Sequence, residues 1–174
     1  TIVGTNGKYS TIQALYAILK KANFKCSIYT SPHIKKINER FIFDNEELND
    51  EELNNLLEKI EEVNNNQPIT LFHRFDATNI LRKNLASIIT SIGLDHLDWL
   101  PENEQTIEKI IFEKTSSLLN SKIIVAKQSS KKIGEYIKKT ISNNPSQKLF
   151  YNEDYNYSLK ENNFFYYEDK FGGI

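Results

Sequence analysis

Residues 86–92 (Ala-Ser-Ile-Ile-Thr-Ser-Ile) form a nearly continuous apolar run, and this feature constrains the fold most. Strands covered on both faces of a parallel sheet have such a composition, so we expect a central parallel strand here. The β-branched runs at 1–3 and 123–126 predict two further buried strands. Apolar residues at helical spacing lie at 10–21, 49–63, 105–119 and 130–141. This strand–helix alternation predicts an α/β fold with a mostly parallel sheet flanked by helices.

Weaker signals complete the expected order of elements. Residues 25–30 and 41–43 have the composition of short strands. Asn49 and Glu52 have the spacing of a capping box, which predicts a helix start, and the asparagines at 64–66 predict the end of that helix. Residues 149–171 carry many of the 9 Tyr and 10 Phe in short runs, so we expect a small antiparallel β extension at the C-terminal end.

Composition excludes several functional classes. The chain has 22 Lys+Arg against 23 Asp+Glu, so it has no basic field with which to hold nucleic acid. Mean hydropathy is −0.52, and no stretch approaches the roughly 20 apolar residues that cross a bilayer. Residues 1–10 lack the features of a secretory signal, and Cys26, the only cysteine, excludes an internal disulfide. We therefore expect a cytoplasmic protein whose partners include neither nucleic acid nor a membrane.

The sharpest chemical signal is the segment Gly-Thr-Asn-Gly-Lys-Tyr-Ser-Thr at 4–11, between an expected strand and an expected helix. Backbone N–H groups in such a turn, the positive end of the helix dipole and a lysine together make a cradle for polyphosphate. Lys8 can neutralise phosphate charge, while the hydroxyls at 10 and 11 can touch phosphate or its metal. The segment departs from the GxxxxGK[ST] pattern at Ile2 and at Tyr9. A strand–turn–helix corner without a ligand is the alternative interpretation.

Two loops and one lysine are weaker candidates. Residues 30–34 (Thr-Ser-Pro-His-Ile) follow an expected strand, where ligands gather in an open α/β sheet, although such a turn is more often a plain loop. His96 lies between Asp95 and Asp98 after the central strand, where it could bind a metal or only cap the junction. A lone histidine among acids suits Mg²⁺ shared with nucleotide phosphates better than zinc. Periodicity alone makes Lys114 an ordinary solvated lysine.

Taken in order, these segments resemble the folylpolyglutamate synthase/dihydrofolate synthase branch of the Mur ligase superfamily. That branch carries GTNGKGS, TSPHL with a following ERF or ERV, DATNI, TxIGLDHxDWLG and REKAGI. The corresponding residues of this chain lie at 4–10, 30–34 with 39–41, 76–80, 93–100 and 113–114. The resemblance implies that residues 1–174 form a P-loop-type central ATPase domain of an ATP-dependent carboxylate–amine ligase.

The resemblance implies a specific reaction. The γ-phosphate of ATP passes to the carboxylate of a pteroate or folate, and the amino group of L-glutamate then attacks the acyl phosphate. A carboxylate is a poor electrophile until it is phosphorylated, and phosphoryl transfer needs positioning and cationic charge above all. The implied cofactors are ATP and two Mg²⁺ ions, the implied partners are dihydropteroate or folate and L-glutamate, and the implied enzyme is a monomer.

The resemblance also implies roles for individual residues. The ATP phosphates would be held by Thr5, Asn6, Gly7, Lys8 and Ser10. Mg²⁺ would be bound by Ser31 and His96 on two sides of the γ-phosphate. Lys114 matches the family lysine that is carbamylated and ligates the second Mg²⁺, so Lys114 and His96 would be the catalytic residues. The pterin would contact Thr70, Phe72, Asp76 and Ala77, with Asp76 accepting from pterin N–H groups and Phe72 stacking on the ring.

The chain departs from the family pattern in three places. Tyr9 stands where the family has a glycine, and Thr-Ser-Ser at 115–117 replaces Ala-Gly-Ile. The run from Phe72 to Phe75 leaves no room for a family helix and strand that end in EVGLGGR, which supplies a Mg²⁺-ligating glutamate. We therefore expect that this internal segment, and the C-terminal glutamate-ligase domain, are absent from the sequence.

Two alternative functions stay open. The first is a UDP-muramoyl peptide ligase of the same superfamily, although Asp-Ala-Thr-Asn at 76–79 and Asp98-Trp99 favour the folate branch. The second is a catalytically inactive paralogue that binds nucleotide, for which Tyr9 and the missing glutamate are the arguments.

Overall fold

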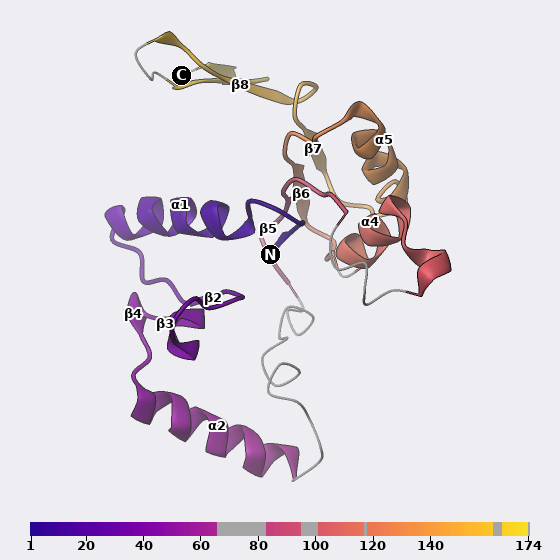
Figure 1. Cartoon of the computed structure of the whole chain (residues 1–174). Helices are drawn as coiled ribbons and strands as arrows, with labels where there is room; N and C mark the ends of the chain where they lie inside the picture. Colours follow the sequence, from indigo (N-terminus) through magenta and orange to yellow (C-terminus); the bar gives the residue numbers. More distant parts are fainter. Residues whose placement is uncertain (66–82, 95–100, 117, 162–164, 174) are drawn as a thin grey trace. The chain divides into compact units, whose positions relative to one another are not determined.

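The computed structural model describes residues 1–65, 83–94, 101–116, 118–161 and 165–173. The chain divides into two compact units, one formed by Thr1–Lys8 with Asn79–Ile174 and the other by Tyr9–Thr78. Figure 1 labels most of their helices and strands.

The first unit is built on a four-stranded parallel sheet. Its strand order is β1-β5-β6-β7, with β1 at Ile2–Val3, β5 at Ala86–Ile89, β6 at Lys122–Val125 and β7 at Lys148–Phe150. Every pairing in this sheet is parallel. The apolar run at 86–92 therefore supplies an inner strand of a parallel sheet, which confirms the prediction.

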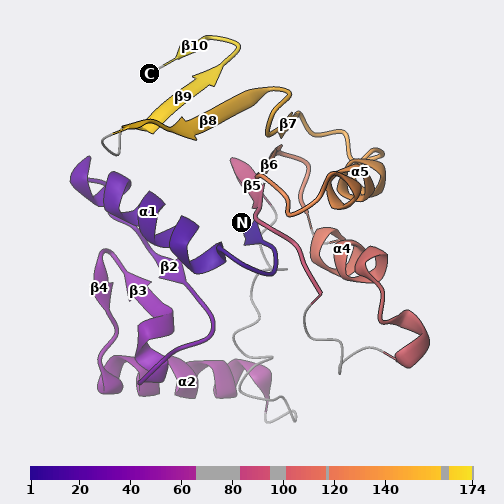
Figure 2. The ribbon, with the colours of Figure 1, turned by 45° about the horizontal axis from the view of Figure 1, so that its top comes forward.

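Two helices cover one face of this sheet. The first is α4 (Ile107–Thr115) and the second is α5 (Lys131–Thr140), and Figure 2 shows them side by side next to β6. Their start residues are set by the side chains of Thr106 and Ser130, which accept hydrogen bonds from N–H groups of the first turn. The shared core consists of Ile89, Ile92, Ile110, Ile111, Leu118, Ile123, Val125, Ile137 and Ile141.

The other face of the sheet is less buried than the sequence predicts. Ile89 and Ile123 are fully buried, whereas Ile88 and Ile124, which alternate with them, are only half-buried. The face that carries Ile89 and Ile123 is therefore the more deeply buried of the two.

The tail of the chain forms the antiparallel extension that its aromatic runs predict. It consists of β8 (Tyr155–Leu159), β9 (Phe165–Asp169) and β10 (Gly172–Gly173). The rings of Tyr157 and Phe165 stack across the strands, with centroids 5.7 Å apart. One boundary differs from the prediction, because residues 149 and 150, expected to begin the extension, lie in β7 of the parallel sheet.

The described residues of the second unit, up to residue 65, form the α-helices α1 and α2 and a small antiparallel sheet. Its sheet has the order β2-β3-β4, with β2 at Ile28–Tyr29, β3 at Phe41–Phe43 and β4 at Glu46–Glu47. The turn between β3 and β4 has positive φ at both Asp44 (52°) and Asn45 (75°), as a tight type I′ hairpin requires. A one-turn 3-10 helix, η1 (Ile37–Arg40), precedes β3, and a second, η4 (Glu102–Glu104), lies in the first unit before α4.

The strand at 25–30 does not join the parallel sheet that the strand–helix alternation predicts. It is shortened to β2, which pairs antiparallel with β3. The connection explains the direction of this pairing, because residues 30–40 are too few for the crossover of a dozen or more residues that a parallel pair of β2 and β3 would require.

The helices of the second unit begin and end near their predicted positions. Helix α1 spans Lys8–Lys21 and α2 spans Asp50–Asn64. Asn49 and Glu52 form the predicted capping box, with both hydrogen bonds at 2.9 Å, and Asn65 ends α2 with a φ of 55°. The last turn of α2 extends past the small core around Leu53, so Val63 is 88% exposed. Within the described ranges, no helix has the length and apolar character to cross a bilayer.

Candidate functional site

The loop between β1 and α1 has a backbone that only glycine adopts easily. Gly4 has a φ of 142° and Gly7 a φ of 86°. A Cβ atom on Gly4 would lie 2.1 Å from Oγ1 of Thr90, so a side chain has no room there. The glycines of the motif therefore allow a close approach between this loop and the strand end at Thr90.

The same loop is hydrogen-bonded to the residues that follow β5. The N–H groups of Thr5 and Asn6 both donate to the carbonyl oxygen of Ser91, at 3.0 and 3.1 Å. The hydroxyl of Thr5 donates to the carbonyl oxygen of Gly93 and accepts from the Gly93 N–H, each at 3.1 Å. The phosphate-loop segment and the start of the segment that carries His96 are therefore fixed to one another.

Lys8 places a positive charge over this turn. Its Nζ donates to the carbonyl oxygens of Gly4 and Thr5, at 2.8 and 3.0 Å. Lys8 is also the first residue of α1, whose N-terminal end carries a partial positive charge. Ser10 follows in the first turn of the helix, and the side chain of Tyr9 is 55% exposed. The turn thus concentrates cationic character where the sequence predicts phosphate binding.

Gln128 is a residue of this region that the motifs did not identify. Its carboxamide donates to the carbonyl oxygens of Thr90 and Ala126 and accepts from the N–H of Ile92. Its position in the sequence could have identified it as a candidate site residue. Gln128 comes shortly after a predicted strand, at the edge where the carboxyl ends of parallel strands meet.

The segment at 31–36 is held by two residues of η1. The carboxylate of Glu39 accepts from the N–H groups of Ile34, Lys35 and Lys36 at 2.9–3.0 Å. These backbone donors hold the pKa of Glu39 below its ordinary value. Nε of buried Arg40 donates to Nδ1 of His33 at 3.0 Å, while Ser31 and His33 are exposed.

The position of this segment corrects one prediction. Ser31 and His33 follow β2, which belongs to the antiparallel sheet of the second unit. The prediction that the strand before them belongs to the parallel sheet is therefore wrong, and the roles of Ser31 and His33 stay predictions.

The remaining predicted residues fall into two groups. Lys114 is half-buried in the last turn of α4, and the next residue, Thr115, is buried with its hydroxyl donating to the carbonyl oxygen of Ile111 at 2.7 Å. Thr70, Phe72, Asp76, Ala77 and His96 lie outside the described residues. Among the residues that are described, no three His, Cys, Asp or Glu side chains gather into a metal-binding group.

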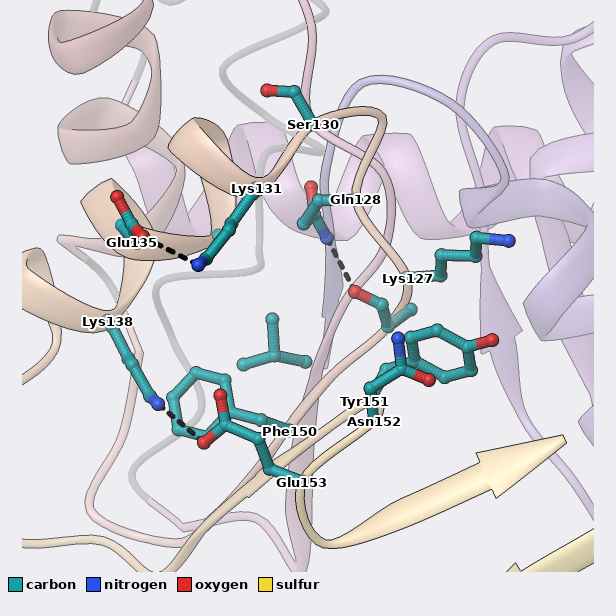
Figure 3. A pocket seen from close by; sticks show the side chains of 13 residues that line it. Lys127, Gln128, Ser130, Lys131, Glu135, Lys138, Phe150, Tyr151, Asn152 and Glu153 are labelled. Atoms are coloured by element: carbon teal, nitrogen blue, oxygen red, sulfur yellow. Dashed lines mark hydrogen bonds and ion pairs between the residues drawn. The ribbon is translucent and has the colours of Figure 1, made fainter.

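A cleft of about 620 Å³ opens beside Gln128, past the carboxyl ends of β6 and β7. Figure 3 shows its charged side chains in pairs, Lys131 with Glu135 and Lys138 with Glu153. Lys127 lies over the ring of Tyr151, with Nζ 5.7 Å from its centroid. The lysines of this cleft are therefore engaged by neighbouring carboxylates and an aromatic ring.

The curated relatives of this chain share one name, dihydrofolate synthase/folylpolyglutamate synthase, among the first matches. No family model matches the chain. It is 34% identical, over 140 residues, to the dihydrofolate synthase/folylpolyglutamate synthase of Haemophilus influenzae, covering 66% of this chain and 31% of that protein. The chain spans about a third of the length of the curated relatives it matches.

Solved structures share the fold over nearly the whole chain. A structure of Escherichia coli FolC in complex with DHPP and ADP superimposes with a TM-score of 0.85 and 25% identity, over 99% of this chain and 46% of that one. The Yersinia pestis bifunctional folylpolyglutamate synthase/dihydrofolate synthase, complexed with AMPPNP and a Mn ion, gives a TM-score of 0.84 at 24% identity, over 99% and 47%. The sequence matches and the shared fold together show that this chain belongs to the folylpolyglutamate synthase/dihydrofolate synthase branch.

Proposed function

We propose that the polypeptide carrying this sequence ligates L-glutamate to a pteroate or folate carboxylate, using ATP. The carboxylate takes the γ-phosphate to form an acyl phosphate, and the glutamate amine then attacks the acyl carbon and releases phosphate. The activity is that of a dihydrofolate synthase, a folylpolyglutamate synthase or both. Two findings support the proposal: relatives bear these names, and the E. coli FolC structure was solved with DHPP and ADP.

The phosphate loop is the observation that carries the proposal. Its two positive-φ glycines hold a tight turn against the strand end at Thr90, directly before the N-terminus of α1, and the ammonium of Lys8 lies over this turn. When ATP binds, Lys8 exchanges the carbonyl oxygens of Gly4 and Thr5 for phosphate oxygens, which bear more negative charge. The complete phosphate site in this proposal consists of Thr5, Asn6, Gly7, Lys8 and Ser10.

The residues proposed for metal binding have the donor chemistry that suits Mg²⁺. Ser31 offers an exposed hydroxyl oxygen, and oxygen donors are what a hard divalent cation prefers. His96 is the proposed ligand on the other side of the γ-phosphate, and a carbamate on half-buried Lys114 would add oxygen donors for a second ion. When bound, two Mg²⁺ ions would neutralise charge on the transferring phosphoryl group.

The substrate contacts and the wider setting are also proposals. We assign pterin binding to Thr70, Phe72, Asp76 and Ala77, on the family motifs alone. We further propose that residues 1–174 are the ATP-binding part of a longer ligase, which is monomeric and cytoplasmic. In this proposal, residues 1–174 lack an internal segment between Phe72 and Phe75 and the C-terminal glutamate-ligase domain. The near-neutral charge supports this setting, and so do the relatives, of whose length the matched residues span about a third.

The test is the release of phosphate from ATP by the full polypeptide that carries this sequence. We expect Mg²⁺-dependent release only when L-glutamate and either dihydropteroate or a folate are both present. Equal turnover with UDP-muramoyl substrates would reject the folate assignment. ATP binding without phosphate release in any of these mixtures would instead identify an inactive nucleotide-binding paralogue.

A pair of lysine variants tests the role of the loop. Lys8→Met removes the charge over the turn and is expected to lower kcat/KM roughly 100-fold, the usual effect of losing one electrostatic contact to a transferring group. Lys21→Met makes the same chemical change at an exposed position in the last turn of α1 and is expected to leave turnover unchanged. Equal activities of the two variants would remove Lys8 from the site.

A further inference from the structure

The side chain of Gln128 bridges two neighbouring strands beyond their last paired residues. Nε2 donates to the carbonyl oxygen of Ala126 at 2.8 Å, just past β6, and to that of Thr90 at 3.2 Å, just past β5. Oε1 accepts from the N–H of Ile92 at 2.9 Å. Both hydrogens of the carboxamide and one lone pair of its oxygen are therefore used. Figure 3 draws the bond from Nε2 to the carbonyl oxygen of Ala126.

Thr90 and Ile92, the two residues after β5 to which Gln128 is hydrogen-bonded, lie on either side of Ser91. The carbonyl oxygen of Ser91 accepts hydrogen bonds from two N–H groups of the phosphate loop, those of Thr5 and Asn6. Because peptide units are planar, holding the carbonyl of Thr90 and the N–H of Ile92 restricts the direction in which the Ser91 carbonyl points. The same residues continue to Gly93, which pairs with the Thr5 hydroxyl.

We propose that Gln128 is a positioning residue for the phosphate loop. It acts through Ser91: the carboxamide fixes the Ser91 carbonyl, and that carbonyl fixes the N–H groups of Thr5 and Asn6. The structural part of this inference rests on contacts within the first unit. Its consequence for ATP rests on the proposed function.

The bonding pattern calls for a glutamine. A carboxamide can donate two hydrogen bonds and accept others from one planar group. A glutamate of the same length keeps the acceptor for Ile92 but sets a carboxylate against the carbonyl oxygens of Thr90 and Ala126. Methionine matches the length and volume but neither donates to these carbonyls nor accepts strongly from Ile92.

The experiment measures amide hydrogen exchange in Gln128→Met. We expect the amides of Thr5 and Asn6 to exchange about tenfold faster than in the wild type, because loss of a bridging hydrogen-bond set makes local opening easier. The amides of Ile110 in α4 and Ile141 after α5, which bond within the helical layer, are expected to keep their rates. Gln147→Met, the same change at an exposed side chain, is the matched control and is expected to match the wild type.

Two outcomes overturn the proposal. Unchanged exchange at Thr5 and Asn6 would show that the loop does not depend on Gln128. An equal acceleration at Ile110 and Ile141 would show that Gln128 stabilises the whole unit without a specific effect on the loop. Gln128→Glu supplies a second variant, in which Thr5 and Asn6 are also expected to exchange faster than in the wild type.

ATP binding separates this inference from the proposed function. Gln128→Met is expected to raise the Kd for Mg²⁺-ATP about tenfold, while Gln147→Met leaves it unchanged. A wild-type polypeptide that binds no ATP would contradict the proposed function, and the exchange rates of Thr5 and Asn6 would still decide the role of Gln128. If Gln128→Met and the wild type bind Mg²⁺-ATP with equal affinity, the role of Gln128 is contradicted, whereas the proposed function is not.

Discussion

The hydroxyl of Thr5 hydrogen-bonds to both backbone groups of Gly93, donating to its carbonyl oxygen and accepting from its N–H at 3.1 Å. The two residues belong to two of the family motifs, one that suits phosphate binding and one that continues to His96. A single side chain thus joins the two motifs through the end of the central strand.

Replacing Thr5 by valine removes both bonds while preserving the shape of the side chain. We expect Thr5→Val to lower the free energy of unfolding by about 1–2 kcal/mol, because the Gly93 groups lose their partner in a partly buried position. Thr5→Ser keeps the hydroxyl and is expected to lose less than half as much. Urea denaturation measures both, and equal losses in the two variants would show that the methyl group, not the hydroxyl, is what stabilises the contact.

Gly4 and Gly134 make a matched pair for testing the loop backbone. Gly4→Ala puts a Cβ atom 2.1 Å from the Thr90 hydroxyl at a φ of 142°, so we expect a loss of roughly 2–4 kcal/mol in unfolding free energy. Gly134 lies in α5 with nothing within 4 Å of an added Cβ, so Gly134→Ala is expected to gain up to about 1 kcal/mol from helix propensity. Thermal unfolding of both variants checks the prediction, which fails if Gly4→Ala is as stable as the wild type.

Tyr155 makes the stability of the first unit sensitive to alkaline pH. Burial raises its pKa from 10.0 to about 12, with smaller contributions from neighbouring tyrosines, and its hydroxyl donates to the carbonyl oxygen of Val125 at 3.0 Å. Because the folded pKa is the higher one, the stabilisation is complete below pH 10 and is lost as pH rises toward 12.

Tyr155→Phe is therefore expected to flatten the decline of unfolding free energy between pH 10 and 12. Tyr9→Phe changes an exposed phenol and is expected to leave the decline as in the wild type. Denaturant unfolding across this pH range measures both, and an unchanged slope in Tyr155→Phe would contradict the assignment.

The contact between Arg40 and His33 predicts the tautomer of the imidazole. Nε of an arginine can only donate, so Nδ1 of His33 accepts and the neutral ring carries its proton on Nε2. Nitrogen NMR of the imidazole is expected to show an unprotonated Nδ1 in the wild type and a mixture of tautomers in Arg40→Met. A protonated Nδ1 in the neutral wild-type ring would contradict the contact.

The sequence by itself determined the features that depend on near neighbours in the chain. The capping box of Asn49 and Glu52, the aromatic antiparallel extension and the glycine turn before α1 all follow from residues a few positions apart. The inner strand at 86–89 followed from its apolar run, because burial in a parallel sheet requires such a composition. The order of the motifs identified the family.

Tertiary structure decided whatever depends on residues far apart in the chain. The bonds of Thr5 to Gly93 and of Gln128 to Thr90 join residues that are 88 and 38 positions apart, and no local pattern marks them. A hydrogen bond between distant residues depends on how the strands are ordered and aligned, and that arrangement is a property of the whole sheet.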